Sequence, residues 1–228
     1  MQDKPLQIAV MAPLVPGGGA MNIDVILKDR RHEIRFSIEA LPSETLLDIL
    51  ETIRKDKKPD LLYRHSCHHG SCGSCGAMID GKPRLLCLTT VGELASDTIL
   101  LEPLAKMMEI EGIAVWPGSF FDALPETDYM RPAENEGGGS RLENCIECGV
   151  CVAACPAPQP FIGPAALAAV AVEMEKHPER SKEMKSIADS PEGTKACEKA
   201  FECSRCCPQG VAPGRKIAEL ARKEETHR

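Results

Sequence analysis

The residues best able to do chemistry in this chain are its twelve cysteines, which fall into three groups. The middle group reads Cys145-Ile-Glu-Cys148-Gly-Val-Cys151-Val-Ala-Ala-Cys155-Pro156, with three cysteines at every third residue and a fourth before a proline. Thiolates at this spacing can hold a cubic iron–sulfur cluster, and the fourth cysteine of such a run ligates a second cluster where two are present. The middle group therefore predicts another set of cysteines elsewhere in the chain.

That second set lies near the C-terminus, as Cys197-x5-Cys203-x3-Cys207-Pro208. Ala200 stands where the spacing C-x2-C-x2-C-x3-C-P places a further thiol. If the last cysteine of each set binds the cluster of the other set, Cys207 joins the first three cysteines of the middle group. This predicts one [4Fe–4S] cluster, held by Cys145, Cys148, Cys151 and Cys207. A cubane short of one ligand can lose that iron and persist as [3Fe–4S], and such a cluster is predicted on the remaining three thiols, Cys155, Cys197 and Cys203.

The remaining group precedes the other two, so it is the first in chain order, and it reads Cys67-x4-Cys72-x2-Cys75-x11-Cys87. The middle group is then the second and the C-terminal set the third. The spacing C-x4-C-x2-C is the plant-type arrangement of [2Fe–2S] ligands. Glycines at 70, 73 and 76 allow the chain to wrap closely, with its N–H groups toward the sulfur atoms. A tight turn at Asp80-Gly81 would return Cys87 to the loop as the fourth ligand.

Three alternatives stay open for these groups. A structural zinc site also uses four thiolates, although it favours two C-x-x-C knuckles and the first group has one. His68 and His69 could replace a ligand, as in Rieske centres, but with four cysteines in place we expect surface loop residues. Cys206 is left over, and it either packs against its neighbours or supplies the missing ligand of the three-iron site.

Composition favours metal over disulfides as the use of these cysteines. Disulfides belong to oxidising compartments, and the start of the chain lacks the basic region of a secretory signal. No apolar run approaches the roughly 20 residues needed to span a bilayer. The net charge of −7 is opposite in sign to the basic surface that nucleic-acid binding requires. We therefore expect a cytoplasmic protein without a nucleic-acid partner.

The elements that position the first group are expected to be mainly strands. Residues 22–27 and 33–38 predict a hairpin, and Ser43 is expected to cap a helix with apolar residues at 46, 47, 49, 50 and 53. Strands at 77–79 and 84–87 flank the Asp80-Gly81 turn, and a further strand lies near 98–101. This order resembles that of a plant-type [2Fe–2S] ferredoxin, and the resemblance implies a β-grasp fold.

The other two groups are expected between helices. Pro164 after Gly163 marks the start of a helix that ends at Lys176, before Pro178. Residues 179–189 and 217–223 predict further helices. We therefore predict an α+β chain with four segments: a flexible leader at 1–20, a [2Fe–2S] ferredoxin-like domain at 21–105, an acidic linker at 106–140, and an α-helical ferredoxin domain at 141–228.

In this order the motifs resemble the iron–sulfur subunit of succinate dehydrogenase and fumarate reductase. The resemblance covers most of the chain from about residue 22. Besides the cysteines it rests on Leu62-Tyr63-Arg64-His-Ser-Cys67, Leu101-Glu-Pro-Leu104, Phe161-Ile-Gly-Pro-Ala165 and Cys207-Pro-Gln-Gly. It implies [2Fe–2S], [4Fe–4S] and [3Fe–4S] clusters on the residues given above, and a partner flavoprotein with FAD that interconverts succinate and fumarate. The chain would then be an electron-transfer subunit of an oxidoreductase with no substrate site of its own, held peripherally on the cytoplasmic face of the inner membrane by partner subunits.

Two departures from the resemblance bear on the distal acceptor. Members that reduce ubiquinone carry tryptophans in a longer segment after the cysteine at 155, whereas Pro156-Ala-Pro-Gln-Pro160 is short and has none. They also have a histidine after the cysteine at 197, where this chain has Glu198. The acceptor could thus be a quinone in a membrane-anchor subunit or a soluble redox subunit. Two other functions stay open: service to a different flavin-dependent organic-acid or thioester oxidoreductase, and a zinc-stabilised interaction module.

Overall fold

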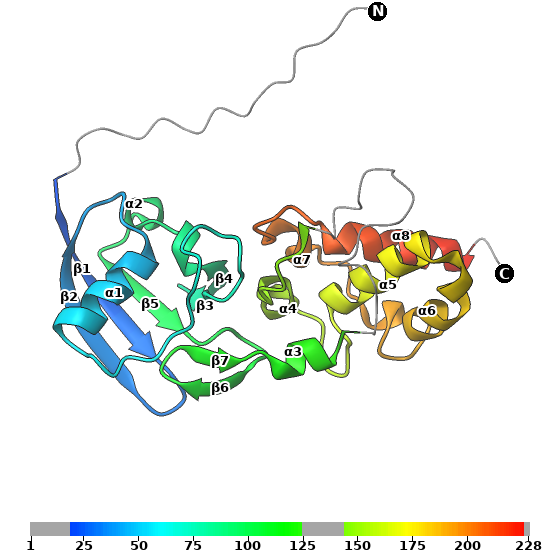
Figure 1. Cartoon of the computed structure of the whole chain (residues 1–228), viewed down its shortest axis with the longest axis horizontal. Helices are drawn as coiled ribbons and strands as arrows, with labels where there is room; N and C mark the ends of the chain where they lie inside the picture. Colours follow the sequence, from blue (N-terminus) through cyan, green and yellow to red (C-terminus); the bar gives the residue numbers. More distant parts are fainter. Residues whose placement is uncertain (1–18, 125–143, 226–228) are drawn as a thin grey trace, which may run out of the picture.

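The computed structural model of the chain describes residues 19–124 and 144–225, so most of the expected leader lies outside the described residues. The described chain has a sheet-containing part and a helical part, which lie side by side (Figure 1). The first part is a five-stranded mixed sheet of order β2-β1-β5-β3-β4, in which only the β1–β5 pair is parallel. Its strands are β1 (Met21–Lys28), β2 (Glu33–Ala40), β3 (Gly76–Ile79), β4 (Lys82–Leu85) and β5 (Thr98–Glu102).

The central strands and one helix form the core of this part. Alternate residues of β1 point inward, with Ile23, Val25 and Leu27 buried, as a strand with one covered face requires. Helix α1 (Leu46–Asp56) lies against the sheet (Figure 1). Its apolar stripe is buried in the same core. Between β4 and β5 lie the short helices η1 (Leu86–Leu88) and α2 (Val91–Leu94).

The start of α1 differs from the prediction. The N-cap is Thr45, not Ser43: the Thr45 hydroxyl accepts from the Asp48 N–H at 3.2 Å, and the Asp48 carboxylate accepts from the Thr45 N–H at 2.9 Å. This reciprocal pair is a capping box, built here with Asp in place of the usual Glu or Gln. Ser43 is exposed and precedes the helix by three residues. The prediction was wrong because two capping residues lie close together, and the partner at the third helical position decides between them.

The segment expected as a linker contains regular structure. Strands β6 (Met108–Glu111) and β7 (Ala114–Trp116) form an antiparallel hairpin, and α3 (Gly118–Asp122) follows it toward the helical part (Figure 1). Met107, Val115 and Phe120 are buried there, so apolar packing outweighs the acidic composition of this stretch. Residues 125–140 of the expected linker lie outside the described residues.

The second part is helical, as predicted. Its helices are α4 (Val150–Ala154), α5 (Pro164–Lys176), η3 (Pro178–Arg180), α6 (Ser181–Ala188), η4 (Thr194–Ala196), α7 (Glu202–Arg205) and α8 (Pro213–Glu225). Helix α5 is the central one, because residues 164–173 are all buried and α6 and α8 pack against it. Its many alanines allow this close approach.

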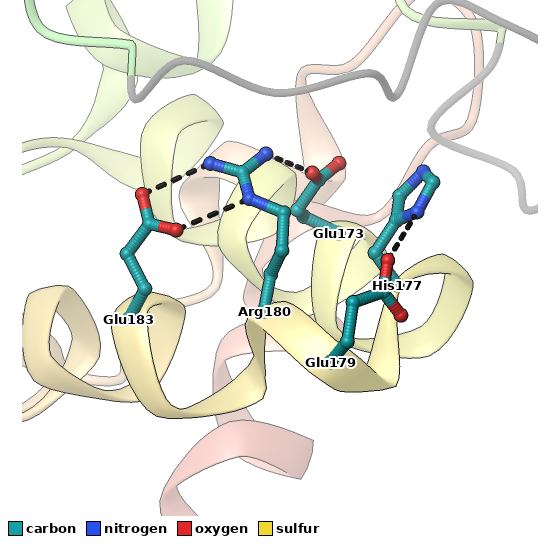
Figure 2. A network of polar contacts seen from close by, with 5 residues as sticks. All are labelled: Glu173, His177, Glu179, Arg180 and Glu183. Atoms are coloured by element: carbon teal, nitrogen blue, oxygen red, sulfur yellow. Dashed lines mark hydrogen bonds and ion pairs between the residues drawn. The ribbon is translucent and has the colours of Figure 1, made fainter.

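One buried charge lies on the central helix. The Glu173 side chain is 0% exposed and accepts hydrogen bonds from Arg180, which also binds Glu183 at the start of α6 (Figure 2). A carboxylate can be buried at acceptable cost only when it is paired and hydrogen-bonded. The Arg180 guanidinium therefore ties α5 to α6 across the turn that joins them.

Candidate iron–sulfur cluster sites

The first cysteine loop directs backbone N–H groups at a sulfur atom. The Cys67 Sγ accepts from the N–H groups of Ser71 at 3.2 Å, Cys72 at 3.3 Å and His69 at 3.5 Å. These donors favour the thiolate, so they lower the pKa of Cys67 to about 6, led by the His69 N–H. Gly70 and Gly73, at φ +78° and +70°, provide the left-handed turns that orient the loop. Such a loop suits an anionic sulfur centre.

The hairpin returns the remaining two cysteines of this group to the same place. The β3–β4 turn lies at Asp80-Gly81, and η1 then carries Cys87 to 3.3 Å, Sγ to Sγ, from Cys75. Burial raises the pKa of Cys75 to about 12, so this thiol ionises only when a cation compensates its charge. Cys72 lies close enough for its charge to act on Cys75, and the Cys67 N–H contacts the Cys72 Sγ at 3.4 Å. The four predicted thiols thus meet, and their donor set fits a [2Fe–2S] group.

In the helical part, four cysteines line one hollow. Cys151 lies on α4, whereas the others lie in the loops before α4 and α8: Cys145, Cys148 and Cys207. Burial raises the pKa of Cys145, and that of Cys148 to about 11, so these thiols also need a bound cation to ionise. The Val211 N–H donates to the Cys207 Sγ at 3.4 Å. These are the four cysteines predicted above for the [4Fe–4S] cluster.

A second hollow is lined by the three other predicted ligands, Cys155, Cys197 and Cys203. Ala200 lines the same hollow and offers a methyl group where a fourth thiol would lie. Gly214 donates its N–H to the Ser204 hydroxyl at 2.9 Å, and a Cβ at 214 would lie 3.2 Å from the Cys203 Sγ. The donor set therefore fits a cluster with three protein ligands.

Cys206 lines neither hollow. Its thiol lies 3.7 Å from the carbonyl oxygens of Val150 and Cys203, and the residue packs against the core of the sheet-containing part. Burial raises its pKa to about 12. Its position outside both hollows matches the packing role considered for this residue.

The first and second cysteine loops are in direct contact. A Cβ at Gly73 would lie 2.4 Å from the Ile146 carbonyl oxygen and 3.0 Å from the Cys148 Cα. The Gln209 side chain donates to the Gly70 carbonyl at 2.8 Å, which joins the third loop to the first. Val150 of α4 is buried in the core of the sheet-containing part. The two parts therefore meet at their cysteine loops.

Two residues of the sites were missed by reasoning from the sequence. Lys106 donates hydrogen bonds from its Nζ to the carbonyl oxygens of Cys155 and Ala157, the latter at 3.2 Å. Gln209 makes the bond to Gly70 described above. Both contacts join residues 49 to 139 positions apart, so no local spacing could have indicated them. His68 and His69 are exposed loop residues, as expected.

Two sequence families match the chain in succession. The family described as "2Fe-2S iron-sulfur cluster binding domain" matches residues 26–117, and the one described as "4Fe-4S dicluster domain" matches residues 141–211. The fumarate reductase iron-sulfur subunit of Wolinella succinogenes is 32% identical over 213 residues, which span 84% of this chain and 89% of that relative. The chain belongs to the family of succinate dehydrogenase and fumarate reductase iron–sulfur subunits.

Further comparisons agree with this family. The fumarate reductase iron-sulfur subunit of Escherichia coli O157:H7 is 30% identical over 208 residues, or 82% of this chain and 84% of that relative. A chain of the "Mycobacterium smegmatis Sdh1 complex in the apo form" superimposes with a TM-score of 0.78, covering 92% of this chain and 98% of that one. At 21% identity this likeness shows the fold.

The predicted fold class is thereby confirmed: a [2Fe–2S] ferredoxin domain precedes an α-helical ferredoxin domain. As a member of this iron–sulfur subunit family, the chain is an electron-transfer subunit of an oxidoreductase. Among the residues that the structure describes, no helix is both long and apolar enough to cross a membrane.

Proposed function

We propose that this subunit carries electrons between the FAD of a partner flavoprotein and a distal acceptor through three clusters. The [2Fe–2S] cluster would be held by Cys67, Cys72, Cys75 and Cys87. The [4Fe–4S] cluster would be held by Cys145, Cys148, Cys151 and Cys207, and the [3Fe–4S] cluster by Cys155, Cys197 and Cys203. When bound, such clusters supply one-electron transfer at potentials set by cluster type, hydrogen bonds and solvent exposure.

The observation that carries the proposal is the unbroken succession of the three cysteine groups. The first loop lies against the second at Gly73 and Ile146. The second and third groups adjoin as well, because α4, which carries Cys151, packs against α7, which carries Cys203. A chain of adjoining cluster sites serves conduction, whereas isolated zinc sites need no such succession.

The protein's own groups have two tasks in this proposal. Backbone N–H groups, such as those of Ser71 and Val211, stabilise charge on the ligating sulfurs. Cys75 and Cys203 are buried, so water has little access to them and would rarely replace these thiolates as ligands. Lys106 fixes the carbonyl oxygens beside Cys155. The protein thereby sets spacing and potential, while the cofactors carry the redox steps.

The partners follow from the relatives, which are named as fumarate reductase and succinate dehydrogenase subunits. We infer a flavoprotein partner that acts on succinate and fumarate. The distal acceptor would be a quinone held by a membrane-anchor subunit, or a soluble redox subunit. The complex would place this chain peripherally on the cytoplasmic face of the inner membrane.

Anaerobic purification of the tagged chain from its native host tests this proposal. We expect a brown complex that contains a flavoprotein and interconverts succinate and fumarate with an artificial electron donor or acceptor. A colourless chain that contains zinc would contradict the redox function. A brown complex that is inactive on both dicarboxylates would reject the proposed substrate and favour a different flavin-dependent dehydrogenase.

Ala200→Cys tests the three-iron assignment. We expect low-temperature EPR of the oxidised wild type to show a [3Fe–4S] signal, and the variant to lose it, because the new thiol completes a [4Fe–4S] cluster. Alanine and cysteine are both small, so the loop should keep its fold. If Cys206 were already the fourth ligand, the wild type would lack the three-iron signal, and Cys206→Ser would alter the spectrum while Ala200→Cys would not.

A further inference from the structure

Three side chains in and next to the first cysteine loop lie close together, and none of them is among the predicted cluster ligands. They are Glu51 on α1, and His65 and His68 in the loop. One ligand atom from each lies within 4.8 Å of the others. We propose that they form a binding site for a divalent transition-metal ion, with Zn²⁺ as the best match to their chemistry.

The distances between the two imidazoles suit chelation. The His65 Nδ1 lies 3.1 Å from the His68 Nε2. Two nitrogens bound tetrahedrally to one zinc ion at about 2.0–2.1 Å are about 3.3 Å apart. The separation of these two nitrogens is therefore close to that of two ligands of one zinc ion. His68 has φ +64°, in the left-handed region that is uncommon for residues other than glycine.

The carboxylate provides the third ligand and the negative charge. Glu51 Oε1 lies 3.6 Å from His65 Nε2, which is not the ring nitrogen that contacts His68. One of the two nitrogens of His65 would bind the ion, and the ring would turn so that the carboxylate and His68 reach the same ion. The other oxygen of Glu51, Oε2, is held by Arg54 at 2.7 Å, and the Tyr63 hydroxyl donates to Oε1. Partners of this kind fix the orientation of metal-binding carboxylates.

The electrostatics of Glu51 agree with a ligand role. Burial raises its pKa, but hydrogen bonds from Tyr63 and Arg54 outweigh burial, so the net shift is downward. The carboxylate is thus ionised at neutral pH and ready to bind a cation. His68 is exposed, which leaves a path for the ion and room for a water molecule as fourth ligand.

The same distances permit a structure without metal, in which His65 and His68 share one hydrogen bond. The two alternatives differ in their response to zinc. The anaerobically purified, cluster-containing chain should bind one Zn²⁺ in equilibrium dialysis with metal analysis, in addition to its iron. We expect Glu51→Gln and His68→Gln to weaken that binding at least about tenfold, since even outer-shell losses have effects of this size.

His69→Gln is the matched control, because this exposed histidine belongs to the same loop but not to the three-residue cluster. It should leave the zinc affinity unchanged. Glu51→Gln is the decisive variant, because it lies on α1, outside the cysteine loop, and iron content and visible circular dichroism report whether the loop keeps its cluster. Equal zinc affinity in wild type and Glu51→Gln would overturn the proposal.

X-ray absorption at the zinc edge identifies the ligands directly. We expect nitrogen and oxygen neighbours at about 2.0–2.2 Å, with the multiple scattering of two imidazoles. Sulfur neighbours at about 2.3 Å would place the zinc on cysteines and would also overturn the proposal. The result does not depend on the identity of the partner flavoprotein.

Discussion

Gly73→Ala tests whether the contact between the first and second cysteine loops holds the two parts of the chain together. The new Cβ would lie 2.4 Å from the Ile146 carbonyl oxygen, whereas ordinary van der Waals contact begins at 3.4 Å. Backbone atoms of two loops must therefore separate by about 1 Å. We expect the variant to be destabilised and its first two cluster sites to move apart.

The cost has two parts that a control can separate. Gly73 has φ +70°, and a residue with a Cβ in this conformation costs about 1–2 kcal/mol. The clash adds about 1–3 kcal/mol, as overpacking does elsewhere. Gly81 has φ +74° with nothing within 4 Å of a new Cβ, so Gly81→Ala carries the first cost alone. The extra loss for Gly73→Ala corresponds to a melting temperature about 2–12 °C lower.

The assay is the anaerobic thermal loss of visible cluster absorption in the two variants and the wild type. EPR of the reduced protein gives a second measure, because magnetic interaction between neighbouring clusters weakens as they separate. We expect weaker interaction in Gly73→Ala and an unchanged one in Gly81→Ala. Equal melting temperatures and equal EPR spectra in the two variants would refute a close contact between the loops.

Two further predictions concern stability. Arg180→Met removes the guanidinium that pairs with the fully buried Glu173, whereas Glu183→Gln changes only the exposed carboxylate. Arg180→Met should therefore lower the melting temperature more than Glu183→Gln. Similar losses would contradict a role for the buried pair. Thr45→Ala should lower the free energy of unfolding by about 1 kcal/mol in chemical denaturation, because it removes the N-cap of α1. Ser43→Ala should change it by less than about 0.5 kcal/mol. The reverse order of losses would show that Ser43 is the cap.

Local spacing carried the prediction of the first cysteine group, because its four cysteines are close in sequence. The run from Cys67 to Cys75 forms one loop, and a tight turn at Asp80-Gly81 brings Cys87 back to 3.3 Å from Cys75, Sγ to Sγ. The same holds for α5, whose start after Gly163 and end before Pro178 are determined by neighbouring residues. In each case the signal and the structure it determines lie within about twenty residues, so the sequence suffices.

Features that depend on distant partners could not be predicted in this way. The acidic composition of residues 106–140 indicated a linker, yet Val115 and Phe120 pack with Ala165 of the helical part and hold a hairpin and a helix in place. Likewise, Glu51 lies on the polar face of an amphipathic helix, and nothing in its local sequence indicates that the loop places His65 beside it. Composition reports on a segment alone, whereas burial is a property of the assembled fold.

The glycines of the first loop illustrate where the two kinds of information meet. Their number suggested close wrapping around a small cluster, and Gly70 and Gly73 do have positive φ. Gly73 also has a second, independent constraint, since a side chain there would meet the loop that carries Cys148. A glycine required only for its positive φ can have open space around it, as Gly81 has, with nothing within 4 Å of an added Cβ. Gly73 therefore serves both the turn of the first cysteine loop and the contact between the two parts of the chain.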